Sequence, residues 1–106
     1  MNTRYLLNDL KLSEEDHQYL LKKISKLEKF LKNCKDHTSI RLEIEVNQDK
    51  RSFWVVEIML KMPKKLFRVE KVGKTFIMAV DEAEDALMKQ LRRFKDKMIT
   101  LRRRQK

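Results

Sequence analysis

The chain has 106 residues, of which 42% are hydrophobic and 40% charged, and 26 Lys and Arg against 16 Asp and Glu give a formal net charge of +10. This length supports one domain over residues 1–106, and the charge favours a polyanionic partner: nucleic acid, an anionic membrane or an acidic protein. The single cysteine, Cys34, excludes a disulfide framework, and one glycine and one proline argue against most nucleotide-dependent enzymes.

The sequence predicts neither a signal peptide nor a membrane-spanning helix. The first eleven residues are not a signal peptide, because Arg4, Asn8 and Asp9 interrupt their apolar side chains. No apolar run approaches the roughly 20 residues that a membrane helix needs. We therefore expect a cytoplasmic protein that does not bind a membrane.

The first part of the chain predicts a strand, a helix and a second strand. Residues 2–7 form a short candidate strand. Ser13 is placed to cap a helix over residues 14–32, whose first turn is acidic and whose apolar side chains recur on one face. Strict alternation of apolar and polar residues over 40–47 then predicts a half-buried strand.

The remainder predicts two more strands and a long helix. Strands over 53–62 and 66–72 complete an antiparallel meander, and Thr75 is placed to cap a helix whose apolar residues repeat at three and four. We expect the acidic cluster 81–85 to complement the dipole of that helix. The predicted fold is α+β, in the order β-α-β-β-β-α: a four-stranded mixed sheet, its first two strands parallel, with two helices on one face.

The positive charge is concentrated in two helical segments. Residues 22–35 carry +5 and residues 86–106 carry +8, so all other residues together carry −3. These cations lie off the apolar stripes, and two adjacent helices would join them into one basic surface that attracts phosphate groups. The candidate RNA-binding residues are Lys22, Lys23, Lys26, Lys29, Lys89, Arg92, Arg93, Lys95, Lys97 and Arg103.

Residues for catalysis or metal binding do not form a recognisable pattern. His17 and His37 have no Cys or acidic residue at the spacing of a zinc site, and Cys34 has no evident base beside it. The aromatic residues occupy strand or apolar-face positions and fit a core better than a base-stacking platform. We therefore expect no enzyme, no metal and no cofactor.

Four sequence blocks resemble the ribosome hibernation-promoting factor family, which includes the ribosome-associated inhibitor proteins. They are Leu-Lys-Leu-Ser at 10–13, Lys-Leu-Glu-Lys-Phe at 26–30, Ala-Val-Asp at 79–81 and the run from 87 to 97. All occur in the family's order on the same predicted layout. Where the family often has an aspartate and, two positions later, a tyrosine, this chain has Thr75 and Ile77.

The resemblance implies a translation inhibitor that binds 16S ribosomal RNA of the 30S subunit, alone or within the 70S ribosome, in the channel used by messenger and transfer RNA. It carries over eight of the ten candidate residues, leaving out Lys22 and Arg103. In long family members a second domain pairs ribosomes, and we expect this chain not to pair ribosomes through itself. We also expect the free protein to be a monomer, because copies that each carry a charge of +10 repel one another. Two alternatives stay open: a general double-stranded-RNA-binding module, and a regulator that binds an acidic protein.

Overall fold

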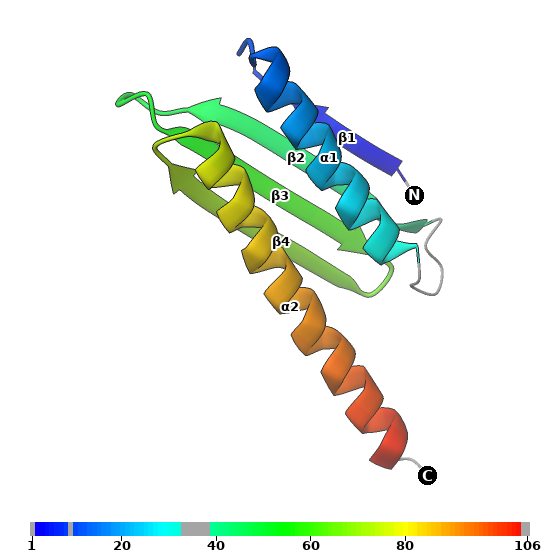
Figure 1. The fold of residues 1–106 in the computed structure, drawn as a ribbon. Coiled ribbons are helices and arrows are strands. Elements are labelled where there is room, and N and C mark those ends of the chain that lie inside the picture. The colour runs from blue at the N-terminus through cyan, green and yellow to red at the C-terminus, as the bar shows by residue number, and fades with distance from the viewer. Residues whose placement is uncertain (1, 9, 33–38, 105–106) are drawn as a thin grey trace.

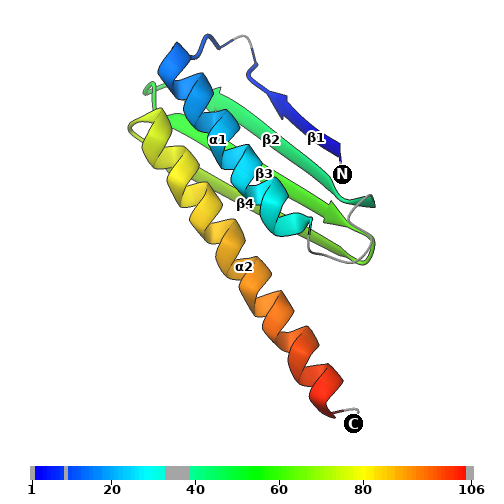
Figure 2. The same ribbon diagram turned by 45° about the vertical axis from the view of Figure 1, so that its right-hand side comes forward.

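The computed structural model describes residues 2–8, 10–32 and 39–104, with side chains described as far as Phe94. Cys34 and His37 lie outside the described residues. The elements are β1 (Asn2–Leu6), α1 (Glu14–Leu31), β2 (Arg41–Gln48), β3 (Trp54–Met62), β4 (Lys65–Gly73) and α2 (Phe76–Arg104). This order confirms the predicted α+β fold, and Figures 1 and 2 show both helices on one face of the sheet.

The four strands form one mixed sheet in the order β1-β2-β3-β4. β1 is parallel to β2, as predicted, and the other neighbours are antiparallel. The register places Leu42 opposite Leu60 and Leu60 opposite Phe67, so the apolar residues of adjacent strands form continuous rows. These rows make the face of the sheet that the helices cover.

Side-chain caps begin both helices at the predicted residues. The Ser13 hydroxyl accepts a hydrogen bond from the Asp16 backbone N–H at 3.1 Å, and the Thr75 hydroxyl accepts one from the Met78 N–H at 3.2 Å. Each cap satisfies a backbone donor that the first helical turn leaves without a partner. The caps thereby fix where each helix starts above the sheet.

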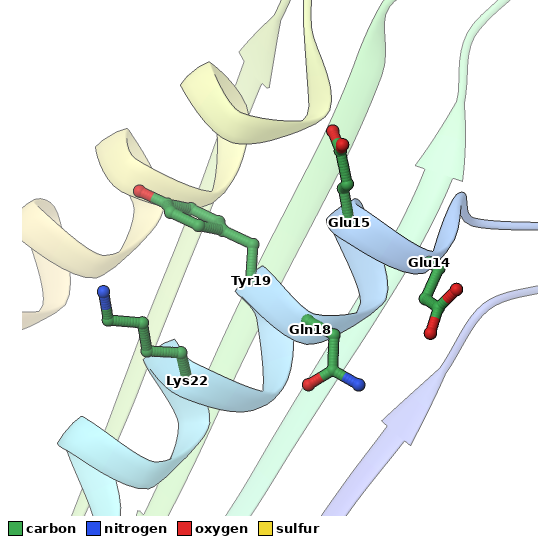
Figure 3. A pocket seen from close by; sticks show the side chains of 5 residues that line it. All are labelled: Glu14, Glu15, Gln18, Tyr19 and Lys22. Atoms are coloured by element: carbon green, nitrogen blue, oxygen red, sulfur yellow. The ribbon is translucent and has the colours of Figure 1, made fainter.

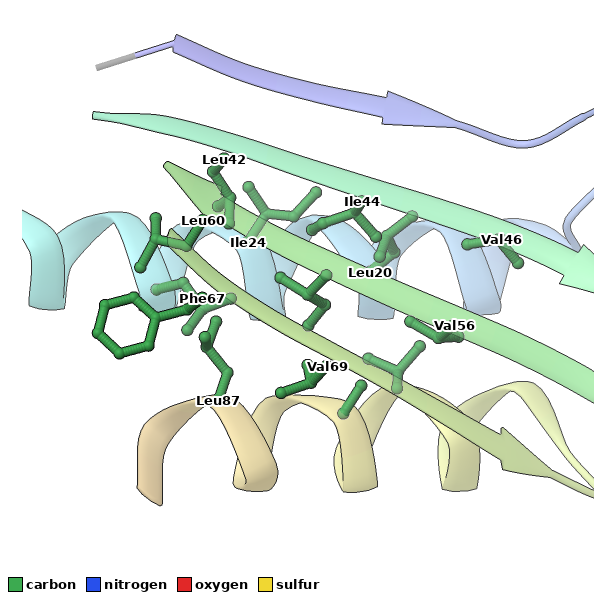
Figure 4. Close-up of a cluster of buried hydrophobic side chains, with 14 of the residues drawn as sticks. Leu20, Ile24, Leu42, Ile44, Val46, Val56, Leu60, Phe67, Val69 and Leu87 are labelled. Atoms are coloured by element: carbon green, nitrogen blue, oxygen red, sulfur yellow. The ribbon is translucent and has the colours of Figure 1, made fainter. Parts of the chain in front are cut away.

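The core lies between the sheet and the apolar stripes of the helices, as the close-up in Figure 4 shows. From the strands it takes Leu42, Ile44, Val56, Leu60 and Phe67, among others. The buried helix residues are Leu20, Ile24, Leu27 and Leu31 from α1 and Phe76, Ala79, Val80, Ala83, Leu87 and Leu91 from α2. The opposite faces of both helices are left for polar and charged side chains.

Gly73 ends β4 where the first turn of α2 packs directly against it. A Cβ atom added at Gly73 would lie 2.7 Å from the backbone nitrogen of Ala79, closer than such atoms approach in folded proteins. The single glycine of the chain therefore permits a close backbone contact and is not needed for an unusual φ angle, since Gly73 has no positive φ. This contact sets the position of α2 on the sheet.

Candidate nucleic-acid interface

The two helices lie side by side and run in the same direction. Tyr19 of α1 contacts Asp81 of α2, and one to two turns later Lys26 contacts Glu84, so sequence numbers rise together along both helices. Figures 1 and 2 show the same arrangement, with both helices starting at one end of the sheet. The lysine-rich second half of α1 therefore lies at the same end of the layer as the basic second half of α2.

The basic surface consists of the exposed cations on these two helices. None of them forms an ion pair with another residue of the described part of the chain. Its members are Lys22, Lys29, Lys32, Lys89, Arg92 and Arg93. The structure thus brings five of the ten predicted RNA-binding residues into one layer and adds Lys32, while their contact with RNA stays a prediction.

Three other predicted residues, Lys95, Lys97 and Arg103, belong to the last turns of α2. The structure describes the helix there but not its side chains. Figure 1 shows this end of α2 continuing beyond the sheet as a single rod. With 29 residues the whole helix measures about 44 Å, since each residue adds about 1.5 Å. The basic C-terminal part of the helix therefore extends away from the domain body.

The two remaining predicted residues, Lys23 and Lys26, form ion pairs with acidic side chains of α2. The Lys23 Nζ atom lies 3.3 Å from Asp81 Oδ1 and 3.4 Å from Glu84 Oε2, and Lys26 Nζ lies 3.1 Å from Glu84 Oε1. The Tyr19 hydroxyl donates a hydrogen bond to Asp81. These five residues are called here the inter-helix ion cluster. It joins α1 to α2 along the line where they meet.

The ion cluster raises the pKa of Tyr19, whose hydroxyl donates a hydrogen bond to Asp81, and it also shifts the pKa values of Lys23 and Asp81. Burial opposes the charged form of Lys23, but its hydrogen bond to Asp81 and the nearby Glu84 carboxylate outweigh that cost and raise its pKa to about 12. Burial likewise favours the neutral form of Asp81, yet the hydrogen bonds from Tyr19 and Lys23 and the charge of Lys26 lower its pKa. Both residues are therefore held in their charged forms at neutral pH.

The depressed pKa of Asp81 makes part of the stability dependent on pH. Its stabilising contribution is present above the unfolded-state pKa of about 3.9 and is lost as the pH falls through the lower folded-state value. We expect urea unfolding at neutral pH to show the wild type more stable than Asp81→Asn, with the two converging near pH 2. A gap of constant size over this range would contradict the role of the ionised Asp81.

The acidic cluster of α2 was wrongly predicted to complement the helix dipole. The first turn of α2 contains no acidic residue, and the dipole acts mainly within that turn. Asp81 and Glu84 point instead to α1, where they meet the lysines of the ion cluster. The predicted continuous basic surface is consequently divided by a line along which positive and negative charges balance.

Lys65 is a cation near this interface that is not among the ten predicted RNA-binding residues. A hollow of about 240 Å³ lies between the start of β4 and α2, and both Lys65 and Arg93 line it. The adjoining Lys64, in the turn between β3 and β4, is also exposed. The charge count along the sequence placed the excess positive charge on the helices alone, although two adjacent lysines follow Pro63 at the turn. The positive region therefore reaches from α2 onto the β3–β4 turn.

A wider hollow of about 510 Å³ lies over the first turns of α1. Figure 3 shows the side chains that line it: Glu14, Glu15, Gln18, Tyr19 and Lys22. Tyr19 and Lys22 extend on the side of α2. Because two carboxylates accompany a single lysine, this hollow does not favour phosphate groups. Lys22 is the one member of the basic surface that lines the hollow, and the other five lie further along the two helices.

Metal ligands do not gather anywhere in the part of the chain that the structure describes. His17 lies beside Tyr5 instead, with its Nε2 atom 3.4 Å from the tyrosine hydroxyl and the two rings edge to face. Within the same residues, neither helix is long and apolar enough to cross a membrane.

Comparison with known proteins decides the family. The family model described as sigma 54 modulation protein / S30EA ribosomal protein matches residues 7–99. The chain belongs to this family. The match confirms the predicted resemblance to ribosome hibernation-promoting factors, and it makes the chain a member of a ribosome-associated family. A search of curated proteins finds no match.

Solved structures support the fold. The N-terminal domain of Thermus thermophilus Protein Y is 24% identical with a TM-score of 0.67, and the alignment covers 89% of this chain and 99% of that one. A ribosomal subunit interface protein from Coxiella burnetii is 15% identical with a TM-score of 0.63, covering 91% and 99%. At these identities the likeness establishes that the chains share a fold.

Proposed function

We propose that this protein binds the 30S ribosomal subunit through its basic surface and inhibits translation by occupying the channel for messenger and transfer RNA. The single observation that carries the proposal is the parallel pair of helices, which places Lys29, Lys89 and Arg92 in one layer. The family membership supplies the ribosome as the partner. The structure from Coxiella burnetii is described as a subunit interface protein, which supports the same location.

Phosphate groups of 16S ribosomal RNA are the ligands that this surface suits best. Its lysine and arginine side chains are exposed and free of carboxylate partners among the described residues, so no internal ion pair must break when RNA binds. Long flexible cations contact phosphates without selecting bases, and recognition then depends on the shape of the RNA. The binding site is accordingly a folded RNA surface, which a ribosomal subunit provides.

Occupancy alone accounts for inhibition in this proposal. The body of the domain covers the channel, and the projecting end of α2 enters it as a rod about 10 to 12 Å wide. Messenger and transfer RNA carry the same phosphate charge and require the same space, so they compete with the protein. Inhibition needs no bond to be made or broken, and the proposed site of action is the cytoplasm.

A competition experiment tests this proposal. Labelled protein is bound to 30S subunits, to 50S subunits and to a free RNA duplex, and a messenger with its transfer RNA is then added. We expect preferential binding to 30S subunits and displacement by the messenger and transfer RNA. Equal binding to the free duplex would favour a general double-stranded-RNA-binding module. Retention of an acidic protein after nuclease treatment, without affinity for 30S, would favour the protein regulator.

A further inference from the structure

Glu84 is the one charged residue that is buried among the side chains that the structure describes. Only 3% of its surface is exposed, although it lies on α2 at the edge of an otherwise apolar stripe. A carboxylate in such a place is costly unless cations compensate it. Its two oxygens face Lys23 and Lys26 at 3.4 and 3.1 Å.

The two lysines differ in how far solvent reaches them. The side chain of Lys23 is 21% exposed, and that of Lys26 is 66% exposed. Glu84 Oε2 makes no hydrogen bond, so its ion pair with Lys23 is what compensates that oxygen. A phosphate that drew Lys23 away would leave the buried oxygen Oε2 of Glu84 without its cation, and only the more exposed Lys26 would still compensate the carboxylate.

The charges of the ion cluster cancel at short range. Lys23 and Lys26 supply two positive charges, and Asp81 and Glu84 supply two negative ones within 3.4 Å of them. An RNA phosphate approaching the line between the helices therefore meets no net positive charge there. The exposed cations on either side, such as Lys29 and Lys89, have no such carboxylate partner among the described residues.

We propose that Glu84, assisted by Asp81, reserves Lys23 and Lys26 for joining the two helices and thereby limits the affinity of the protein for RNA. This inference rests on the proposed RNA-binding function and adds to it a residue that determines which cations contact phosphate. Glu84 acts through the lysines and touches no RNA itself. Lys23 and Lys26 accordingly differ in role from the other predicted RNA-binding residues.

The substitution Glu84→Gln tests the proposal by removing the buried charge at nearly constant size. We expect the variant to bind 30S subunits more tightly than the wild type at low salt, because Lys26 becomes available to one more phosphate. One added phosphate contact makes the loss of affinity between 50 and 200 mM salt about threefold larger than for the wild type. Glu82→Gln is the matched control, since it removes the same charge from an exposed position of the same helix. Glu82→Gln should change both the low-salt affinity for 30S subunits and the salt dependence of that affinity much less than Glu84→Gln does.

A second comparison isolates the lysine. In the wild type, Lys26→Met should change 30S affinity less than Lys29→Met does. In the Glu84→Gln background, Lys26→Met should cost as much affinity as Lys29→Met. If Glu84→Gln does not fold, Glu84→Leu replaces it, because an apolar residue of similar volume suits a buried site.

Two results would overturn the inference. One is a folded Glu84 variant that does not bind 30S subunits more tightly: equal affinity would mean that Glu84 does not limit RNA binding, and weaker affinity would mean that Glu84 holds the lysines in place for RNA. The other is a wild-type background in which Lys26→Met and Lys29→Met lose equal affinity. Elution of the same variants from heparin, a polyanion unrelated to ribosomes, separates this inference from the proposed function. If the wild type did not bind 30S subunits, the proposed function would be wrong. The order in which the variants elute from heparin would still test whether Glu84 keeps Lys23 and Lys26 from binding a polyanion.

Discussion

Affinity for 30S subunits is expected to fall about a thousandfold when salt rises from 50 to 200 mM, for about six neutralised phosphates. The basic surface has six exposed cations in the described part of the chain, and each phosphate contact releases counterions whose return is favoured at high salt. Fluorescence anisotropy of labelled protein titrated with 30S subunits measures the slope of log affinity against log salt. A slope near zero would contradict an electrostatic interface.

Leu91→Ala and Arg93→Glu are expected to separate folding from binding. Leu91 is buried against the core, so its truncation should lower the free energy of unfolding by about 2 to 5 kcal/mol. Arg93 lies exposed two residues later, and its reversal should change stability by no more than about 0.5 kcal/mol. The same reversal should weaken 30S binding and reduce the salt slope by about one.

Urea unfolding and 30S binding, measured on both variants, test whether Leu91 serves folding and Arg93 serves binding. If Arg93→Glu unfolds the domain, the assignment of the exposed face of α2 is wrong. If Leu91→Ala leaves the unfolding midpoint unchanged, the assignment of the buried face is wrong. Arg92→Glu serves as a second exposed control, because it lies between the two on the same turn.

The fold could be predicted from the sequence because each element carries a local pattern. Apolar and polar residues alternate along β2, and apolar residues recur every three or four positions along both helices. These two patterns predict which side chains are buried. Ser13 and Thr75 mark the helix starts, and the short connections between β2, β3 and β4 leave an antiparallel meander as the simple pairing. The predicted bounds of the first five elements differ from those of the structure by no more than one residue at either end.

The candidate site was predicted less completely, because local patterns do not say which helix faces meet. Lys23 and Asp81 are far apart in the sequence, and only the parallel packing of α1 and α2 brings them within 3.3 Å. Lys65 was not predicted for the same reason: it lies at the hollow beside Arg93 only because β4 packs under α2. The sequence did contain one sign of this contact: Glu84 lies four residues after Val80 and three before Leu87, on the apolar stripe of α2, where a carboxylate needs a cation to face it.

The Asp81–Glu84 region also shows why a count of charges overstates a binding surface. The sequence assigned +5 to residues 22–35, but two of these lysines are neutralised by carboxylates of the other helix. The cations that remain exposed are the ones whose removal should matter for RNA.

Sedimentation with 30S subunits tests the central proposal most directly. Wild-type protein and a variant with Lys29, Lys89, Arg92 and Arg93 replaced by alanine are each centrifuged with purified 30S subunits through a low-salt gradient. Both should show the same circular dichroism, since the four residues are exposed. We expect the wild type to travel with the 30S peak and the variant to stay at the top of the gradient. Equal co-sedimentation of the folded variant, or a wild type that remains at the top, would contradict binding through the basic surface.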